Sequence, residues 1–269
     1  MIIGKAISPF VLRKKNGGGG TDADAQAFIT ATGISGTNAT ATNQLVVDLK
    51  AANIWTKMKC IYPFVGGTSA FTHKFNLKDP RDLDAAYRLV FSGGGTFSAN
   101  GYQPNGVNSF ANTFFNPSTQ LTLSSTHLSY YSRTATPVGT TYEIGNGNNA
   151  SNYLFLRPAA LFYSGSSNTS GTTFTTTASA AGFWVGSKRS NSDRETYLNG
   201  ATQTTQTALD NTVYTPVNIY VGAVNNNGTA LYSNKQCAFA SIGDGLTDAE
   251  ALAFRTAVQL FNTTLGRQV

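Results

Sequence analysis

Residues 182–228 limit the fold more than any other part of the chain, because they carry the pattern of three antiparallel strands. The strands are expected at three short β-branched and aromatic runs, Phe183–Gly186, Glu195–Leu198 and Val217–Ala223. Asn199-Gly200 and Asn227-Gly228 are dipeptides that favour tight primed turns. We therefore predict that these runs form the centre of one antiparallel sheet.

The middle of the chain repeats this pattern. Clusters of Gly, Asn, Ser and Thr separate short apolar runs at Leu89–Phe91, Phe110–Phe115, Leu121–Leu123, His127–Tyr131, Tyr142–Ile144, Tyr153–Leu156, Leu161–Tyr163 and Phe174–Thr176. A spacing of about 8–12 residues is typical of a sandwich or barrel. We predict a mainly β protein in which residues 60–246 form one antiparallel β-sandwich of jelly-roll type.

Helical signals flank this region. Thr21-Asp22-Ala23-Asp24 resembles a capping box and opens a short helix that Gly33 should end, and a second helix is predicted from about Ala41 to Lys57. A full capping box, Thr247-Asp248-Ala249-Glu250, precedes an apolar stripe at Phe254, Val258, Phe261 and Leu265. We expect residues 21–59 and 247–269 to pack on the sandwich as helical segments.

The apolar period changes to two after Cys60. Phe71, Phe75 and Leu77 then fall on one face of a predicted strand, and His73 shares that face as a hydrogen-bonded packing residue. Cys60 and Cys237 lie in apolar runs, so we expect free buried thiols rather than a disulfide. Because the cysteines and histidines lack the spacing of zinc ligands, no metal and no cofactor are expected.

The charge distribution argues against nucleic acid as a partner. The net charge is +6, but between Leu89 and Ser187 the only charged residues are Arg133, Glu143 and Arg157. The middle of the chain therefore lacks a footprint for a phosphate backbone. No apolar run approaches the ~20 residues that span a bilayer, so no membrane association is expected either.

Residues 1–20 form an arm that is apolar and basic and ends in four glycines. Its apolar surface is too large to be left free, and the glycines indicate a flexible tether. We expect the arm to attach the protein to a partner through Ile2, Ile3, Ile7, Phe10, Val11, Leu12, Arg13, Lys14 and Lys15. The alternative is an arm that folds back on its own sandwich.

Four blocks of the sequence resemble a recurring module of structural proteins from tailed phages and prophages. They are DADAQAFITATGI, IYPFVGGTSAFTHKFNLKDPRDLDAAYRLVFSGG, HLSYYSRT and CAFASIGDGLTDAEALAFRTAVQLFNTTLGRQV. The strands GFWVGSKR, TYLNG and VNIYVGA are similar to the concanavalin A-like lectin/glucanase (laminin G-like) superfamily. The resemblance implies a virion protein made in the host cytoplasm, such as a tail fibre, head fibre or decoration component. It also implies capsid, portal or tail proteins as partners and a homo-oligomer.

The number and spacing of Asp and Glu residues bear on whether the chain is an enzyme or a binding protein. Glycosidases need two carboxyl groups that flank the scissile bond. The nearest approach is Asp193-Arg194-Glu195, which lacks a third acid and is interpreted as a solvated hairpin end with local ion pairing. We therefore expect no enzymatic activity, with glycoside hydrolase kept as an alternative.

A surface rich in Asn, Ser, Thr and Tyr suits a neutral sugar ligand. The residues predicted to bind a host-surface glycan from exposed loops are Tyr102, Asn105, Tyr131, Asn146, Asn148 and Asn149. A purely structural head or tail decoration protein without a ligand is the alternative.

Overall fold

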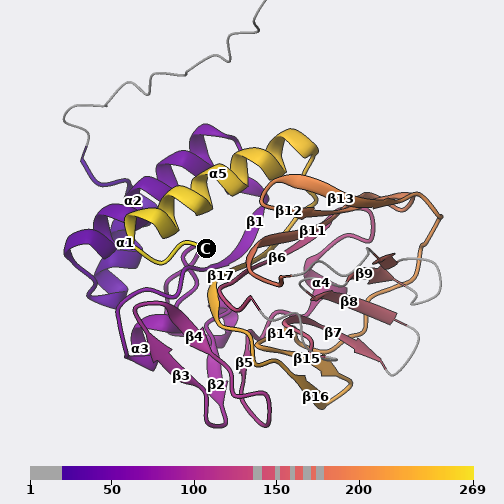
Figure 1. Cartoon of the computed structure of the whole chain (residues 1–269), viewed down its shortest axis with the longest axis horizontal. Helices are drawn as coiled ribbons and strands as arrows, with labels where there is room; N and C mark the ends of the chain where they lie inside the picture. The colour runs from indigo at the N-terminus through magenta and orange to yellow at the C-terminus, as the bar shows by residue number, and fades with distance from the viewer. Residues whose placement is uncertain (1–19, 136–140, 149–151, 158–160, 166–170, 174–178) are drawn as a thin grey trace, which may run out of the picture.

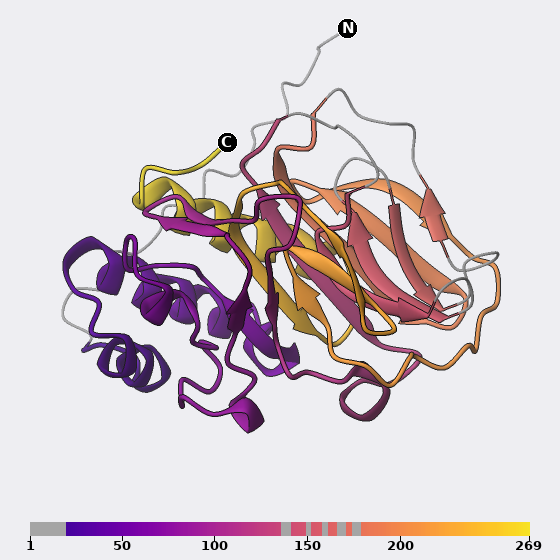
Figure 2. The ribbon, with the colours of Figure 1, turned by 90° about the horizontal axis from the view of Figure 1, so that it is seen from below.

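The fold has three layers, a helical layer and two β-sheets (Figure 1). The computed structural model describes residues 20–135, 141–148, 152–157, 161–165, 171–173 and 179–269. The view in Figure 2 shows the helices on one side of the first sheet and the second sheet on the other. The predicted antiparallel β-sandwich with small flanking helices is confirmed.

The helical segments are α1 (Ala23–Thr32), α2 (Gly36–Ala51), α3 (Ala70–His73), α4 (Pro117–Gln120) and α5 (Asp248–Thr264), with 3₁₀ turns η1 (Trp55–Lys57) and η2 (Asp84–Ala86). Within the described ranges, no helix is both long and apolar enough to cross a membrane.

The first sheet has the order β13-β12-β11-β6-β17-β4-β3, and β1 also pairs with β17. Its strands are β1 (Met58–Tyr62), β3 (Thr96–Ser98), β4 (Gly101–Gln103), β6 (Thr126–Ser132), β11 (Gly182–Ser190), β12 (Asp193–Leu198), β13 (Ala201–Gln206) and β17 (Cys237–Gly243).

The second sheet has the order β10-β9-β8-β7-β14-β5-β2, and β15 pairs with both β7 and β16. Its strands are β2 (Val90–Ser92), β5 (Phe110–Asn112), β7 (Ile144–Asn148), β8 (Asn152–Arg157), β9 (Leu161–Gly165), β10 (Gly171–Thr173), β14 (Tyr220–Val221), β15 (Ala223–Asn226) and β16 (Thr229–Tyr232).

The first sheet is apolar on both faces, and this creates two cores. On β11, Phe183 and Val185 pack in the core beneath the helices, whereas Trp184 packs in the core between the sheets. Successive strand residues point to opposite faces, so this uninterrupted apolar run serves both layers. The first sheet is therefore the middle layer of the molecule.

Helix α5 begins as its sequence predicts. Thr247 accepts a hydrogen bond from the Glu250 backbone N–H, and the Glu250 side chain accepts one from the Thr247 backbone, so the capping box is complete. The stripe residues Phe254, Val258 and Phe261 are buried against the first sheet. The predicted apolar face of this helix is thus confirmed.

Three strand predictions need correction. The run Leu121–Leu123 forms no strand, because it belongs to the turn between α4 and β6, where Thr122 and Ser125 make an isolated bridge. Residues 71–77 do not form a strand, because the Ser69 side chain accepts a hydrogen bond from the Phe71 N–H and caps the helical turn α3. Phe71 is consequently exposed, whereas Phe75 and Leu77 are buried. The run at Val217–Ala223 does not join β11 and β12, because β14 pairs with β5 and β7 of the second sheet.

The two predicted turns at Asn199-Gly200 and Asn227-Gly228 are present, with positive φ at all four residues. Helix α1 is capped by Asp22 rather than by Thr21, and α2 begins at Gly36, before the expected Ala41. The run at Phe174–Thr176 lies outside the described residues. The division of the chain into an arm (1–20), a helical segment (21–59), a sandwich (60–246) and a C-terminal helix (247–269) stays a prediction.

The buried thiols and His73 behave as expected. Cys60 and Cys237 are free and buried. The His73 ring packs in the interior, with Nε2 2.9 Å from the Gly67 carbonyl oxygen. His127 is also buried, with Nδ1 2.7 Å from the Asp244 carbonyl oxygen and Nε2 2.9 Å from the Ser241 hydroxyl. Burial lowers the pKa of both histidines to about 4.

Candidate functional site

Three of the predicted glycan-binding residues are buried, so the expectation that they lie on exposed loops is wrong. Tyr131 stacks on Phe183, and its hydroxyl donates to Gln259. Tyr102 lies in the core between the sheets. Asn146 points inward from β7, and its amide donates to backbone carbonyls of the segment before β14. These three residues lie on strands, and their side chains point inward. A composition rich in Tyr and Asn gives no information on which way a side chain points.

Asn105 is exposed, but its side chain organises its own loop. Its Oδ1 accepts hydrogen bonds from the backbone N–H groups of Val107, Asn108 and Ser109. Asn148 ends β7, and Asn149 lies outside the described residues. The arm residues expected to mediate attachment also lie outside them.

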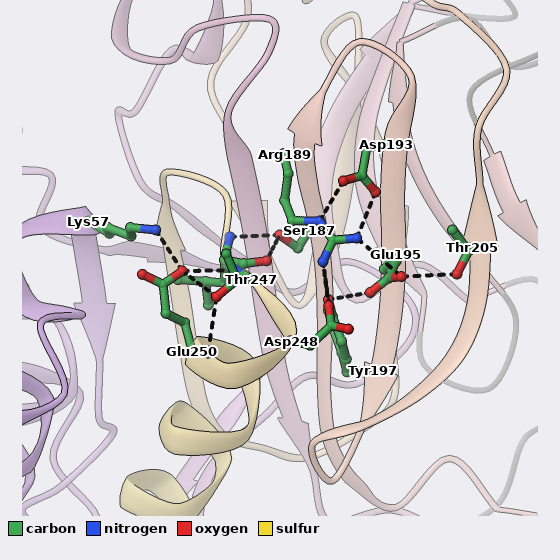
Figure 3. Close-up of polar contacts among 11 residues, drawn as sticks. Lys57, Ser187, Arg189, Asp193, Glu195, Tyr197, Thr205, Thr247, Asp248 and Glu250 are labelled. Carbon is green, nitrogen blue, oxygen red and sulfur yellow. Dashed lines mark hydrogen bonds and ion pairs between the residues drawn. The ribbon is translucent and has the colours of Figure 1, made fainter.

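The carboxylates of the Asp193–Glu195 segment belong to a network around Arg189 (Figure 3). Arg189 contacts Asp193 at 2.7 Å, Glu195 at 3.1 Å and also Asp248 in the first turn of α5. The Tyr197 hydroxyl lies 2.5 Å from Glu195 Oε2 and 2.9 Å from Asp248 Oδ1. The hydrogen bond from Tyr197, together with Arg189, lowers the pKa of Asp248.

This network corrects the interpretation of a solvated hairpin end. The ion pairing is present, but Glu195 is only 7% exposed and Arg194 is buried. Thr205 on β13 donates to Glu195 at 3.0 Å, so three strands and a helix meet at this carboxylate. The network joins α5 to the first sheet. Among the described residues, no group of His, Cys, Asp and Glu side chains is suited to hold a metal ion.

The outer face of the second sheet carries a different set of side chains. We call it the aromatic face and define it by Val90, Ser92, Phe110, Asn112, Tyr220 and Tyr232. The rings of Phe110 and Tyr220 stack with centroids 4.3 Å apart and planes inclined by 20°. The Tyr232 ring lies 6.4 Å from that of Phe110. All three rings are half-buried.

Strand register explains why these side chains meet. Val90 pairs with Asn112, which pairs with Tyr220, so the three lie side by side across β2, β5 and β14. Ala111 and Val221 occupy the alternate positions and point into the core between the sheets. The defining residues of the aromatic face include no charged side chain. Burial, with a smaller effect of nearby Tyr232, raises the pKa of Tyr220.

A pocket opens where the aromatic face ends at β2. Its volume is about 340 Å³, and Phe71, Lys74, Arg88 and Val90 line it, so Val90 belongs to both features. Phe71 is 51% exposed. A pocket of this size is within the range of small-ligand sites, and we call it the rim pocket.

Residues Phe71, Phe110 and Tyr220 were missed by the sequence analysis. The alternation of Phe110 and Asn112 with Ala111 does indicate one strand face of larger side chains. The stacking partner Tyr220 is more than a hundred residues away, so no local signal links the two.

Comparisons with known proteins give only distant similarities. No family model and no curated protein matches the sequence. Among solved structures, the chain is similar to domain 4 of AbnA, a GH43 extracellular arabinanase from Geobacillus stearothermophilus, with 13% identity, a TM-score of 0.43, and coverage of 74% of this chain and 98% of that one. It is also similar to a mutant of Trypanosoma rangeli sialidase, with 11% identity, a TM-score of 0.48, and coverage of 81% of this chain and 39% of that one.

The binding domain of Paraclostridial Mosquitocidal Protein 1 is a third similar structure, with 13% identity, a TM-score of 0.37, and coverage of 65% of this chain and 45% of that one. The chain thus spans less than half the length of the sialidase structure and of the mosquitocidal binding domain. The function of the chain is therefore inferred from its own residues.

Proposed function

We propose that this protein is a non-enzymatic virion component whose sandwich binds glycans on the aromatic face. The observation that carries the binding proposal is the stack of Phe110 and Tyr220 in an aromatic face whose defining residues carry no charge. Aromatic rings bind the apolar C–H faces of sugars, and phenol and amide groups exchange hydrogen bonds with sugar hydroxyls. Tyr220, Tyr232 and Asn112 supply such groups beside the stack.

Removal of the stack tests this proposal. Tyr220→Ala and Phe110→Ala are expected to weaken binding of the purified protein to host-surface polysaccharide at least about tenfold, which corresponds to about 1.4 kcal/mol. Leu252→Ala is a suitable control, because Leu252 is 54% exposed on α5, which packs on the first sheet and not on the second. A folded parent protein that binds no polysaccharide would instead favour the purely structural decoration role.

The absence of enzymatic activity is part of the proposal. Glycoside hydrolysis needs two carboxyl groups with access to the bond that breaks. Glu195 is held by Tyr197, Thr205 and Arg189, and Asp193 is held by the same arginine, which supports a role in packing. Incubation with bacterial surface polysaccharides should release no reducing ends. Release that disappears in a Glu195→Gln variant would establish an enzyme.

The virion role rests on the four sequence blocks that resemble phage structural proteins. We propose that residues 1–20 attach the chain to a capsid, portal or tail protein and that the sandwich projects from the particle, as a homo-oligomer. Deletion of residues 1–20 should leave the melting temperature unchanged and prevent incorporation into particles. A truncated protein that unfolds would show that the arm belongs to the core of its own chain.

A further inference from the structure

We propose that the rim pocket is the specificity subsite of the glycan site and that it takes an uncharged sugar ring with neighbouring free hydroxyls. This inference rests on the proposed glycan binding and deepens it. The aromatic face supplies stacking that many sugars satisfy, whereas the rim pocket holds the charged and directional groups that can distinguish one sugar from another.

Charge balance excludes an ionic ligand as the preferred one. Four side chains form a quartet, of which Lys74 and Arg88 line the pocket, whereas Asp82 and Asp84 pair with them outside its lining. Lys74 Nζ lies 2.6 Å from Asp82, and Arg88 lies 2.7 Å from Asp82 and 2.8 Å from Asp84. Two cations and two carboxylates leave the quartet with no net charge, so the quartet itself gives a uronic acid or a phosphate no net attraction.

The quartet nevertheless keeps groups for a neutral ligand. Asp82 and Asp84 lie outside the pocket lining, but their side chains are 42% and 51% exposed, so their remaining lone pairs can accept from hydroxyls of a sugar that extends past Arg88. Arg88 uses Nε and Nη1 for the two aspartates, and its Nη2 group is left to donate. One sugar hydroxyl can donate to an aspartate while the adjacent hydroxyl accepts from Arg88, so this pair of groups fits two neighbouring hydroxyls.

Phe71 supplies the apolar contact of the subsite. Its ring is fixed by an edge contact with Phe75, with centroids 5.2 Å apart, and by Lys74 Nζ at 4.3 Å from the ring centroid. Half of the residue stays exposed even so. A ring held in place and still exposed can stack on a sugar at little cost in side-chain entropy.

The position of Val90 links the subsite to the aromatic face. Val90 lines the pocket and lies two strands from Tyr220, a distance of about 10 Å at normal strand spacing. A ligand that reaches from the Tyr220 ring into the pocket must therefore be longer than one sugar ring. The two features together point to a neutral oligosaccharide with one residue in the pocket.

Binding of a panel of neutral and uronic-acid oligosaccharides to the full chain tests the inference. The parent should bind neutral members better, with affinity that changes less than about twofold between about 0.05 and about 0.5 M salt. Arg88→Gln and Phe71→Ala should each weaken that binding at least about tenfold. Arg81→Gln is the matched control, because Arg81 is a nearby exposed arginine that pairs with Asp79 away from the pocket.

Each other result has a definite meaning. Tighter binding of the acidic members, lost at high salt, would overturn the inference in favour of an anion site. Pocket variants that bind like the parent, while Tyr220→Ala does not bind, would refute the subsite and leave the proposed function standing. A parent that binds no member would refute both. Asp84→Asn, at a more exposed position, replaces Arg88→Gln should that variant fail to fold.

Discussion

Replacement of Arg267 by methionine is expected to lower the free energy of unfolding by about 3 kcal/mol. The side chain is buried, and every donor of its guanidinium finds an acceptor. Nε donates to Asn262, Nη1 to the carbonyls of Phe64 and Ala99, and Nη2 to those of Pro63 and Ala238. Arg267 thus joins the chain after α5 to the loop after β1, the turn before β4, and β17.

Two effects of opposite sign give this magnitude. Methionine would leave four buried acceptors without donors, because the Ala99 carbonyl belongs to an exposed residue, and each costs about 2 kcal/mol, which amounts to about 8 kcal/mol. The arginine itself is costly to bury, because burial lowers its pKa from 12.5 to about 9, equivalent to about 5 kcal/mol that methionine recovers. The unsatisfied acceptors therefore outweigh the relieved burial of the cation.

Urea unfolding of Arg267→Met and of Arg81→Met would measure the difference. Arg81 is 63% exposed, so its variant should stay within about 0.5 kcal/mol of the parent. Arg267→Lys keeps the charge but loses the planar set of donors, and an intermediate loss is expected. An Arg267→Met variant within about 1 kcal/mol of the parent would show that burial of the cation cancels its hydrogen bonds, and the reasoning would be refuted.

Two further predictions concern the core beneath α5. Phe254→Ala and Phe261→Ala should each cost about 3–5 kcal/mol in urea unfolding, because both rings are buried, and a loss below about 0.5 kcal/mol would contradict their packing. The unfolded state protonates His73 and His127 near pH 6.5 and the folded state only near 4, so each histidine should lower the free energy of unfolding by about 1.4 kcal/mol for every unit by which the pH falls in that window. His127→Gln should remove about half of the combined slope and leave the part that His73 contributes, whereas an unchanged slope would assign it to other groups.

The sequence by itself determines the features that depend on neighbours a few residues away. The capping box at Thr247, the stripe from Phe254 to Phe261 and the two Asn-Gly turns all appear where they were predicted. Their causes are local, since a cap needs a side chain three residues from its partner and a primed turn needs residues that tolerate positive φ.

Tertiary structure alone decides the features that join distant parts of the chain. Tyr220 reaches Phe110 because β14 pairs with β5, and Arg267 reaches Phe64 because the end of the chain crosses the loop after β1. Residues 71–77 alternate like a strand, yet the cap at Ser69 and the position beside β2 make Phe71 an exposed ring. Strand pairing across a hundred residues is chosen by the burial of whole faces, and no short pattern records which faces will meet.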